Sequence, residues 1–308
     1  MGSTLAALGL LSQCRWDTDE TYHPIRIGTY LWADSILYFL PADGGNLFPL
    51  QRARALAADG ETIAALSLDG NTLTYYEPAS TSPARSLSLP ASCCAIAPAP
   101  EKAGFLLGAP NGLWEVSPTY RLKALDTTPA FQLISHMSFV LAQSSALAIR
   151  ALSPKPPYLP LASLSLPGPL RAWWVESPTM ATGIFHYGDT LYSFTYQSPA
   201  RLFVIDTLRP ALSLQKATSP YLTARWGTEY TGSFILSPQG ELIPPGTGGV
   251  QTFTVDFFGG YLYYVRADTL WERNLHTNTE TFRAAPFRTM QLKVVGVYSQ
   301  GRAMITTR

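Results

Sequence analysis

The strongest indication of the fold lies in residues 62–77, which read TIAALSLDGNTLTYYE. The first half is apolar and partly alternating, Asp69-Gly70 is a pair typical of tight hairpin turns, and residues 72–77 continue as a second strand pattern. Residues 85–89 alternate again as an outer strand, and residues 95–97 begin the next unit with small side chains. Similar outer strands are expected at residues 120–125, 158–166, 201–205 and 279–283.

This hairpin pattern recurs along the whole chain. Each copy has a Gly, Asp or Asn turn followed by an aliphatic residue that anchors a strand, except for a weak fourth copy at residues 145–150. The copies follow one another at an average interval of about 38 residues, and no segment shows a sustained helical period. The anchor positions are Leu37, Leu73, Leu113, Leu147, Leu191, Ile235, Leu270 and Met304.

A strand-hairpin period near 40 residues resembles the blades of the β-propeller superfamily. The resemblance implies an all-β fold with a single β-propeller over residues 21–308. Eight anchors favour eight blades; seven is the alternative, in which the first and last anchors share one composite blade. The chain ends just after an anchor strand, so we expect the segment before Tyr30 to supply the missing outer strand. Pairing of the N- and C-terminal strands would then close the ring and remove an exposed sheet edge.

The composition excludes several classes of protein. Apolar residues make up 46% and charged residues 14% of the 308 residues, which is the opposite of a disordered chain. The net charge of +1, with scattered arginines, gives no electrostatic footprint for nucleic acid. No apolar run reaches the roughly 20 residues of a membrane-spanning helix, so membrane contact is expected only through a lipid anchor.

Residues 1–20 are expected to form a signal-like segment and a tether. An uncharged apolar run at residues 5–11 is followed by Leu11-Ser12-Gln13-Cys14, which resembles a bacterial lipobox with Cys14 as the lipidated residue. Gln13 departs from the small residue usual there, and the positive start of a secretory signal is missing from the first 14 residues. An exported protein of the periplasm or outer surface is expected; a cytoplasmic protein with an ordinary first strand is the alternative.

The most unusual local cluster is Arg171, Trp173, Trp174 and Glu176. Adjacent residues on a strand point to opposite faces, so at most one of the two tryptophans can join a core between sheets. Exposed Trp beside Arg is typical of an interaction hot spot, which makes these four residues candidates for partner contact. Packing into a neighbouring sheet is the alternative for both tryptophans.

Other chemistry-bearing residues have structural interpretations. The aspartates at the hairpin turns could form a carboxylate ring, but Asp is also a favoured turn residue. His136 and His186 are isolated and interpreted as structural, and Cys93 and Cys94 as small apolar residues in a strand. No zinc spacing, phosphate loop or nucleophile elbow occurs, so we expect no metal and no cofactor, and no catalytic residue can be assigned.

Together these features favour a non-catalytic binding or scaffolding module of the bacterial cell envelope that presents its loops to a protein partner. The alternative is a propeller enzyme, of glycosidase or lyase type, that acts on carbohydrate at the central channel. A broad apolar patch on one face would favour the scaffold. Carboxylates, arginine and histidine gathered on one face would favour the enzyme.

The lipid anchor at Cys14 can be tested directly. Cys14→Ser, expressed behind a complete secretory signal, should move the protein from the membrane fraction to the soluble fraction, because the thiol that carries the lipid is gone. Cell fractionation with immunoblotting measures the shift, and Cys94→Ser is the matched control. Unchanged partitioning of the Cys14 variant would contradict lipidation.

Overall fold

The computed structural model describes residues 20–59, 62–77, 80–102, 104–177, 179–188, 190–210, 235–236, 242–243, 250–256, 261–274, 277, 279–289 and 292–306. These residues form 26 strands and one short 3-10 helix, η1 (Pro100–Lys102). In this part of the chain no helix has the length and apolar character needed to cross a bilayer. The expectation of an all-β fold is therefore confirmed.

The strands assemble into six four-stranded antiparallel sheets and one two-stranded sheet within the described residues. One sheet joins the end of the chain to its beginning, in the order β26 (Leu292–Thr306), β1 (Glu20–Ala33), β2 (Ile36–Pro41) and β3 (Phe48–Arg52). The two-stranded sheet contains β20 (Ile235–Leu236) and β21 (Leu242–Ile243).

Each of the other five sheets uses four consecutive strands in sequence order. They comprise β4 (Ala55–Ala58), β5 (Ile63–Leu66), β6 (Thr72–Tyr76) and β7 (Arg85–Ser88); β8 (Ala95–Pro98), β9 (Phe105–Ala109), β10 (Gly112–Val116) and β11 (Leu122–Asp126); β12 (Gln132–His136), β13 (Phe139–Ser145), β14 (Ala148–Leu152) and β15 (Pro160–Ser165); β16 (Leu170–Ser177), β17 (Met180–Tyr187), β18 (Thr190–Gln197) and β19 (Leu202–Pro210); and β22 (Val250–Asp256), β23 (Tyr261–Arg266), β24 (Thr269–Asn274) and β25 (Glu280–Ala284).

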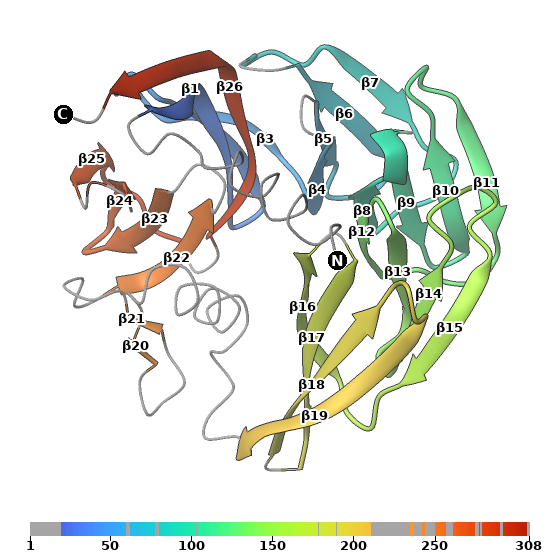
Figure 1. Ribbon diagram of the computed structural model, residues 1–308. Coiled ribbons are helices and arrows are strands. Elements are labelled where there is room, and N and C mark those ends of the chain that lie inside the picture. Colours follow the sequence, from blue (N-terminus) through green and yellow to red (C-terminus); the bar gives the residue numbers. More distant parts are fainter. Residues whose placement is uncertain are drawn as a thin grey trace, which may run out of the picture.

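The sheets follow one another around a common centre (Figure 1). In the sheets that run from β4 to β15, the first strand lies near the centre and the last strand at the periphery (Figure 1). The hairpin and the two strands after it form as the sequence predicted. They are β5 at residues 63–66, its return strand β6, the outer strand β7 and the small-residue strand β8. The repeat pattern thus corresponds to a physical unit, one sheet.

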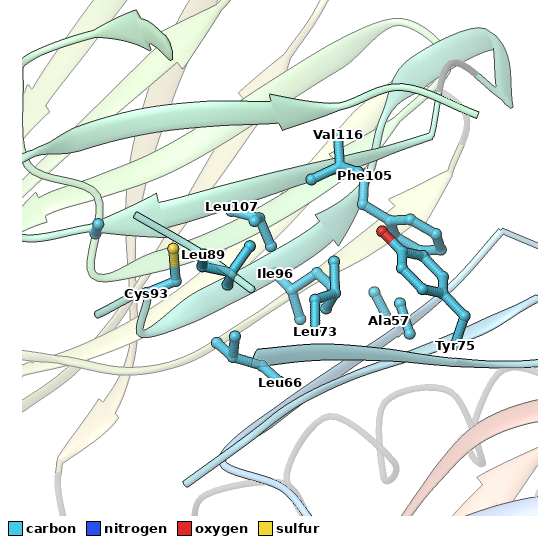
Figure 2. Close-up of a cluster of buried hydrophobic side chains, with 12 residues drawn as sticks. Ala57, Leu66, Leu73, Tyr75, Leu89, Cys93, Ile96, Phe105, Leu107 and Val116 are labelled. Atoms are coloured by element: carbon cyan, nitrogen blue, oxygen red, sulfur yellow. The ribbon is translucent and has the colours of Figure 1, made fainter. Parts of the chain in front are cut away.

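Apolar clusters between neighbouring sheets form the core. Figure 2 shows the cluster in which Leu66, Leu73 and Tyr75 of one sheet meet Ile96 and Phe105 of the next. Equivalent clusters join the β8–β11 sheet to the β12–β15 sheet, the latter to the β16–β19 sheet, and the β1–β3 strands to the β4–β7 sheet. The middle strands β5 and β9 are buried along their whole length, because both faces of a sheet contact a neighbour.

The two ends of the chain meet in one sheet. β26 pairs antiparallel with β1, from Glu20 opposite Thr306 to Ala33 opposite Leu292, as the expectation of N- and C-terminal pairing required. This sheet packs against β23 and β24 through a further apolar cluster. A buried hydrogen bond of 2.9 Å joins the hydroxyls of Thr29 and Tyr263, which are 234 residues apart.

A buried arginine also joins these two sheets. Nε of Arg283 on β25 lies 3.8 Å from a carboxylate oxygen of Glu272, and both side chains are buried. Nη2 of Arg283 donates a hydrogen bond to the backbone carbonyl of Pro41, at the end of β2. The guanidinium therefore connects the last outer strand to the first sheet.

Two details of the sequence interpretation need correction. The anchors Leu37 and Met304 were counted as two blades, yet β2 and β26 belong to the same sheet, as the seven-blade alternative supposed. The N-terminal segment was expected to add an outer strand to the last repeat. Instead, β26 is the first strand of the first sheet. It pairs with one edge of β1, because β2 and β3 already occupy the other side.

Gly70 is required by its neighbours as well as by its conformation. Its φ is +75°, its backbone N–H donates to the carbonyl of Ser67, and a Cβ there would lie 2.1 Å from the backbone oxygen of Cys93. Gly44 has a φ of +90° but open space around it. The β5–β6 turn thus contacts the β7–β8 connection too closely for any side chain.

We predict that Gly70→Ala lowers the free energy of unfolding by more than about 3 kcal/mol, because it combines a left-handed backbone with a backbone clash. Gly44→Ala, the control, should cost only about 1 kcal/mol, from backbone conformation alone. Urea unfolding of the two variants and the wild type measures the difference. Equal losses would contradict the close approach of the two connections.

Candidate functional site

A hollow of about 190 Å³ lies at the ends of β4, β8 and β12, the first strands of three successive sheets. Its lining is mainly apolar, with two carboxylates, an imidazole and a hydroxyl added. The lining residues are Ala58, Asp59, Pro98, Ala99, Pro100, Glu101, Ser135, His136 and Met137. The topology therefore gathers three short segments that are far apart in the sequence.

Hydrogen bonds hold the polar side chains of the hollow. Oδ1 of Asp59 accepts the backbone N–H of Thr62 at 2.9 Å, and Oγ of Ser135 donates to the carbonyl of Pro98. At the surface, Oε1 of Glu101 lies 3.5 Å from Nζ of Lys155 and forms an ion pair with it. Nδ1 of His136 is buried and has no hydrogen-bond partner within the described part of the chain. The arrangement leaves an apolar recess with negative charge beside it.

The opposite end of the sheets carries large exposed apolar side chains. Leu68 lies in the β5–β6 turn, Phe131 directly precedes β12, Leu147 lies in the β13–β14 turn, and Tyr187 ends β17. Each is more than two-fifths exposed. In an antiparallel sheet the connection after the second strand is at the end opposite to the connection after the first. These four residues, here called the apolar end, therefore lie away from the hollow.

No protein-family model and no curated protein matches this sequence. Solved structures do match: a protein from Lactobacillus plantarum is 11% identical, with a TM-score of 0.51 over 91% of this chain and 100% of that chain. The β-propeller domain of Cps50 (Swd1) from Myceliophteria thermophila is 9% identical over 87% of this chain and 89% of that domain, with a TM-score of 0.45. Apo AztD from Citrobacter koseri is 9% identical over 91% of this chain and 76% of that one, with a TM-score of 0.41.

The fold is a β-propeller. At these identities the similarity concerns the fold alone and carries no function. The resemblance inferred from the hairpin repeats is confirmed, since repeated four-stranded antiparallel sheets around a common centre are the defining feature of the architecture.

The cluster predicted as an interaction site lies on β16 of the propeller. Trp173 is half-buried and packs against the apolar cluster between the β12–β15 and β16–β19 sheets, and its part in an interaction site stays a prediction. The side chains of Arg171, Trp174 and Glu176 lie outside the described residues, and their role stays a prediction. Cys14 also lies outside the described residues, as does Asp189 among the turn aspartates.

The cysteines and turn aspartates that the structure does describe have structural roles. Cys93 belongs to the core between sheets, and burial raises the pKa of its thiol to about 11, so it stays protonated at neutral pH. Sγ of Cys94 lies 3.4 Å from the carbonyl oxygens of Gly108 and Ala130. Both residues precede β8 rather than lying in it.

Asp69 organises the hairpin turn between β5 and β6. Its Oδ1 accepts hydrogen bonds from the Ser67 hydroxyl at 2.5 Å and the Asn71 backbone N–H at 3.1 Å. These bonds hold the pKa of the exposed Asp69 carboxyl below its usual value. In the described ranges, no group of three His, Cys, Asp or Glu side chains could hold a metal ion.

Sequence reasoning did not find the hollow. His136 was interpreted as an isolated structural residue, and Asp59 and Glu101 were not singled out. The sequence did contain one indication of the hollow: the first strand of each repeat ends at a similar position within that repeat. Once the propeller is assumed, those ends converge near the centre.

Proposed function

We propose that the protein is a seven-bladed β-propeller that acts as a non-catalytic binding module, with the apolar end as its surface for a protein partner. Six four-stranded sheets, one of which is shared by the two chain ends, supply six blades. The remaining interval, residues 211–249, is about one repeat long and contains β20 and β21. Closure of the ring is supported by the packing of the β1–β2 strands on β23 and β24.

The observation that carries the proposal is the exposure of Leu68, Phe131, Leu147 and Tyr187 at one end of the sheets. Large apolar side chains on loops held by a rigid scaffold are typical of binding surfaces. Phe131 is held in place because its backbone N–H donates to the carbonyl of Gln143. A partner that covers these side chains would gain apolar burial with little ordering cost on this chain.

The alternative, an enzyme that acts on carbohydrate, would use the hollow, which His136, Asp59 and Glu101 line. Among the described residues, the lining contains no arginine, and five of its nine members are alanine, proline or methionine. That composition fits binding better than hydrolysis. We further propose export to the cell envelope, with lipid attached at Cys14. This location rests on residues 5–14 of the sequence.

The binding surface can be tested with two phenylalanines of equal exposure. Phe131 at the apolar end is 41% exposed, and Phe48 on the outer strand β3 is 43% exposed. A photo-crosslinking phenylalanine analogue placed at position 131 in cells of the source organism should give one defined protein adduct. The same analogue at position 48 should give none.

The identified partner is then purified and its affinity measured by titration calorimetry. Phe131→Arg should weaken binding at least about tenfold, as expected for a central apolar contact, and Phe48→Arg should leave binding unchanged. An adduct from position 48 alone, or equal affinities of wild type and the Phe131→Arg variant, would contradict the proposed surface.

A further inference from the structure

We propose that β19, the outer strand of the β16–β19 sheet, pairs with an extended segment of a partner polypeptide. The segment would add an antiparallel strand to this four-stranded sheet and would carry an acidic side chain opposite Arg201. This edge lies at the periphery of the propeller, whereas the apolar end consists of turns and connections (Figure 1). The proposal therefore goes beyond the proposed function, and either one can fail while the other holds.

The backbone of β19 selects a strand as its partner. Among the described strands, β19 is the last of its sheet and pairs on one side only, with β18. In an antiparallel pair every second residue directs its N–H and C=O away from the neighbouring strand. The pairing with β18 is regular from Leu202 opposite Gln197 to Thr207 opposite Tyr192. Residues 202–207 therefore offer an unbroken hydrogen-bonding edge, which is a template for another strand.

β19 lacks the features that block the outer strands of the other sheets. It has nine residues, compared with four to six in β3, β7, β11, β15 and β25. Proline occurs in β3 and β15, and charged residues occur in β7, β11 and β25. In β19 the first charged residue is Asp206, and the proline is its last residue. Short length, charge and proline are the usual protection of a sheet edge, so β19 is the edge left open to pairing.

Exposed aliphatic side chains accompany this edge. Leu202, Val204 and Ile205 are 53%, 37% and 43% exposed. Successive side chains of a strand point to opposite faces of the sheet, so Leu202 and Val204 lie on one face and Ile205 on the other. An added strand with β-branched side chains would cover apolar surface on both faces while its backbone is paired.

Arg201 determines the charge that the partner strand carries and where that charge lies. It is exposed directly before β19, in a turn where its backbone N–H donates to the carbonyl of Ser198. An antiparallel strand runs toward the beginning of β19, so its C-terminal end lies beside Arg201. An acidic side chain there would form a cross-strand pair of opposite charges with the guanidinium.

The same charge argues against a second copy of this chain as the partner. When two copies of one strand pair antiparallel about a two-fold axis, residues opposite each other are separated by an even number of positions in the sequence. Asp206 is the acidic residue of β19, and it lies an odd number of positions after Arg201. The two therefore cannot be opposite each other. Pairing centred on Ile205 would instead place Arg201 opposite Arg209, which is unfavourable.

A synthetic strand tests the proposal. The probe is a fluorescein-labelled peptide with an amide-capped C-terminus, Gly-Thr-Val-Thr-Val-Thr-Glu, and its fluorescence anisotropy is followed as the full chain is added. We expect saturable binding with a dissociation constant on the order of 100 μM, because one short strand must be ordered. Amide hydrogen exchange should slow in residues 202–207 and stay unchanged in residues 122–126 of β11. A peptide with glutamine in place of the glutamate should bind about threefold more weakly.

Variants of two arginines separate the specific charge from general attraction. Arg201→Gln should bind the two peptides equally, and Arg201→Lys should keep the preference for glutamate, because a cation remains opposite it. Arg121→Gln is the matched control, since Arg121 is an exposed arginine directly before the outer strand β11, and it should leave the affinity unchanged. Phe131→Arg should also leave it unchanged, which separates this edge from the apolar end. A circular dichroism spectrum that matches wild type shows that each variant is folded.

Backbone methylation tests the pairing itself. In one peptide the amide nitrogens of the valines are methylated, and in another those of the threonines, so that each peptide keeps donors along one edge only. One of the two should bind like the parent peptide and the other should not bind. Equal affinities of both methylated peptides, no saturable binding of the parent, or exchange protection outside residues 202–207 would overturn the proposal. A wild-type dimer in sedimentation velocity that Ile205→Lys abolishes would assign the edge to a second copy and would overturn it as well.

Discussion

Face-to-face packing of neighbouring sheets is the interaction on which the rest of this structure depends. A four-stranded sheet whose middle strands are apolar on both faces cannot bury them alone. β9, with all five residues from Phe105 to Ala109 buried, contributes Leu107 to the cluster with the preceding sheet and Leu106 to the cluster with the next. At about 25 cal/mol per Å² of apolar surface, such shared burial is the main stabilising term. Each sheet therefore needs a neighbour on either side.

This constraint explains why the chain ends meet. The β26–β1–β2–β3 sheet contacts the β4–β7 sheet on one side and the β22–β25 sheet on the other. The Thr29–Tyr263 hydrogen bond and the bond from Nη2 of Arg283 to the Pro41 carbonyl pair polar groups across this contact. Because loop-closure cost grows only slowly with length, joining residues almost 300 apart is affordable once the faces match.

Local features of the fold could be predicted from sequence, and long-range ones could not. The hairpin at residues 62–77 and its outer strand form where alternation and Asp69-Gly70 placed them, because turn chemistry and strand period are local properties. The sheet to which β26 belongs depends on pairing between residues such as Tyr22 and Met304, which no local pattern records. The hollow was missed for the same reason: Asp59, Glu101 and His136 are ordinary residues until three sheets bring them together. The packing of Trp173 against the next sheet is likewise a long-range contact that its own segment does not record.

We propose that the sheet formed by both chain ends completes the packing order of the propeller. Deleting residues 291–308, which removes β26, tests it most directly through thermal unfolding of the truncated and full-length chains. The account predicts a melting temperature lowered by more than about 10 °C, or loss of the cooperative transition, because β1 loses its partner and the β22–β25 sheet loses part of its neighbour. A melting temperature that matches the full-length chain within error would contradict it.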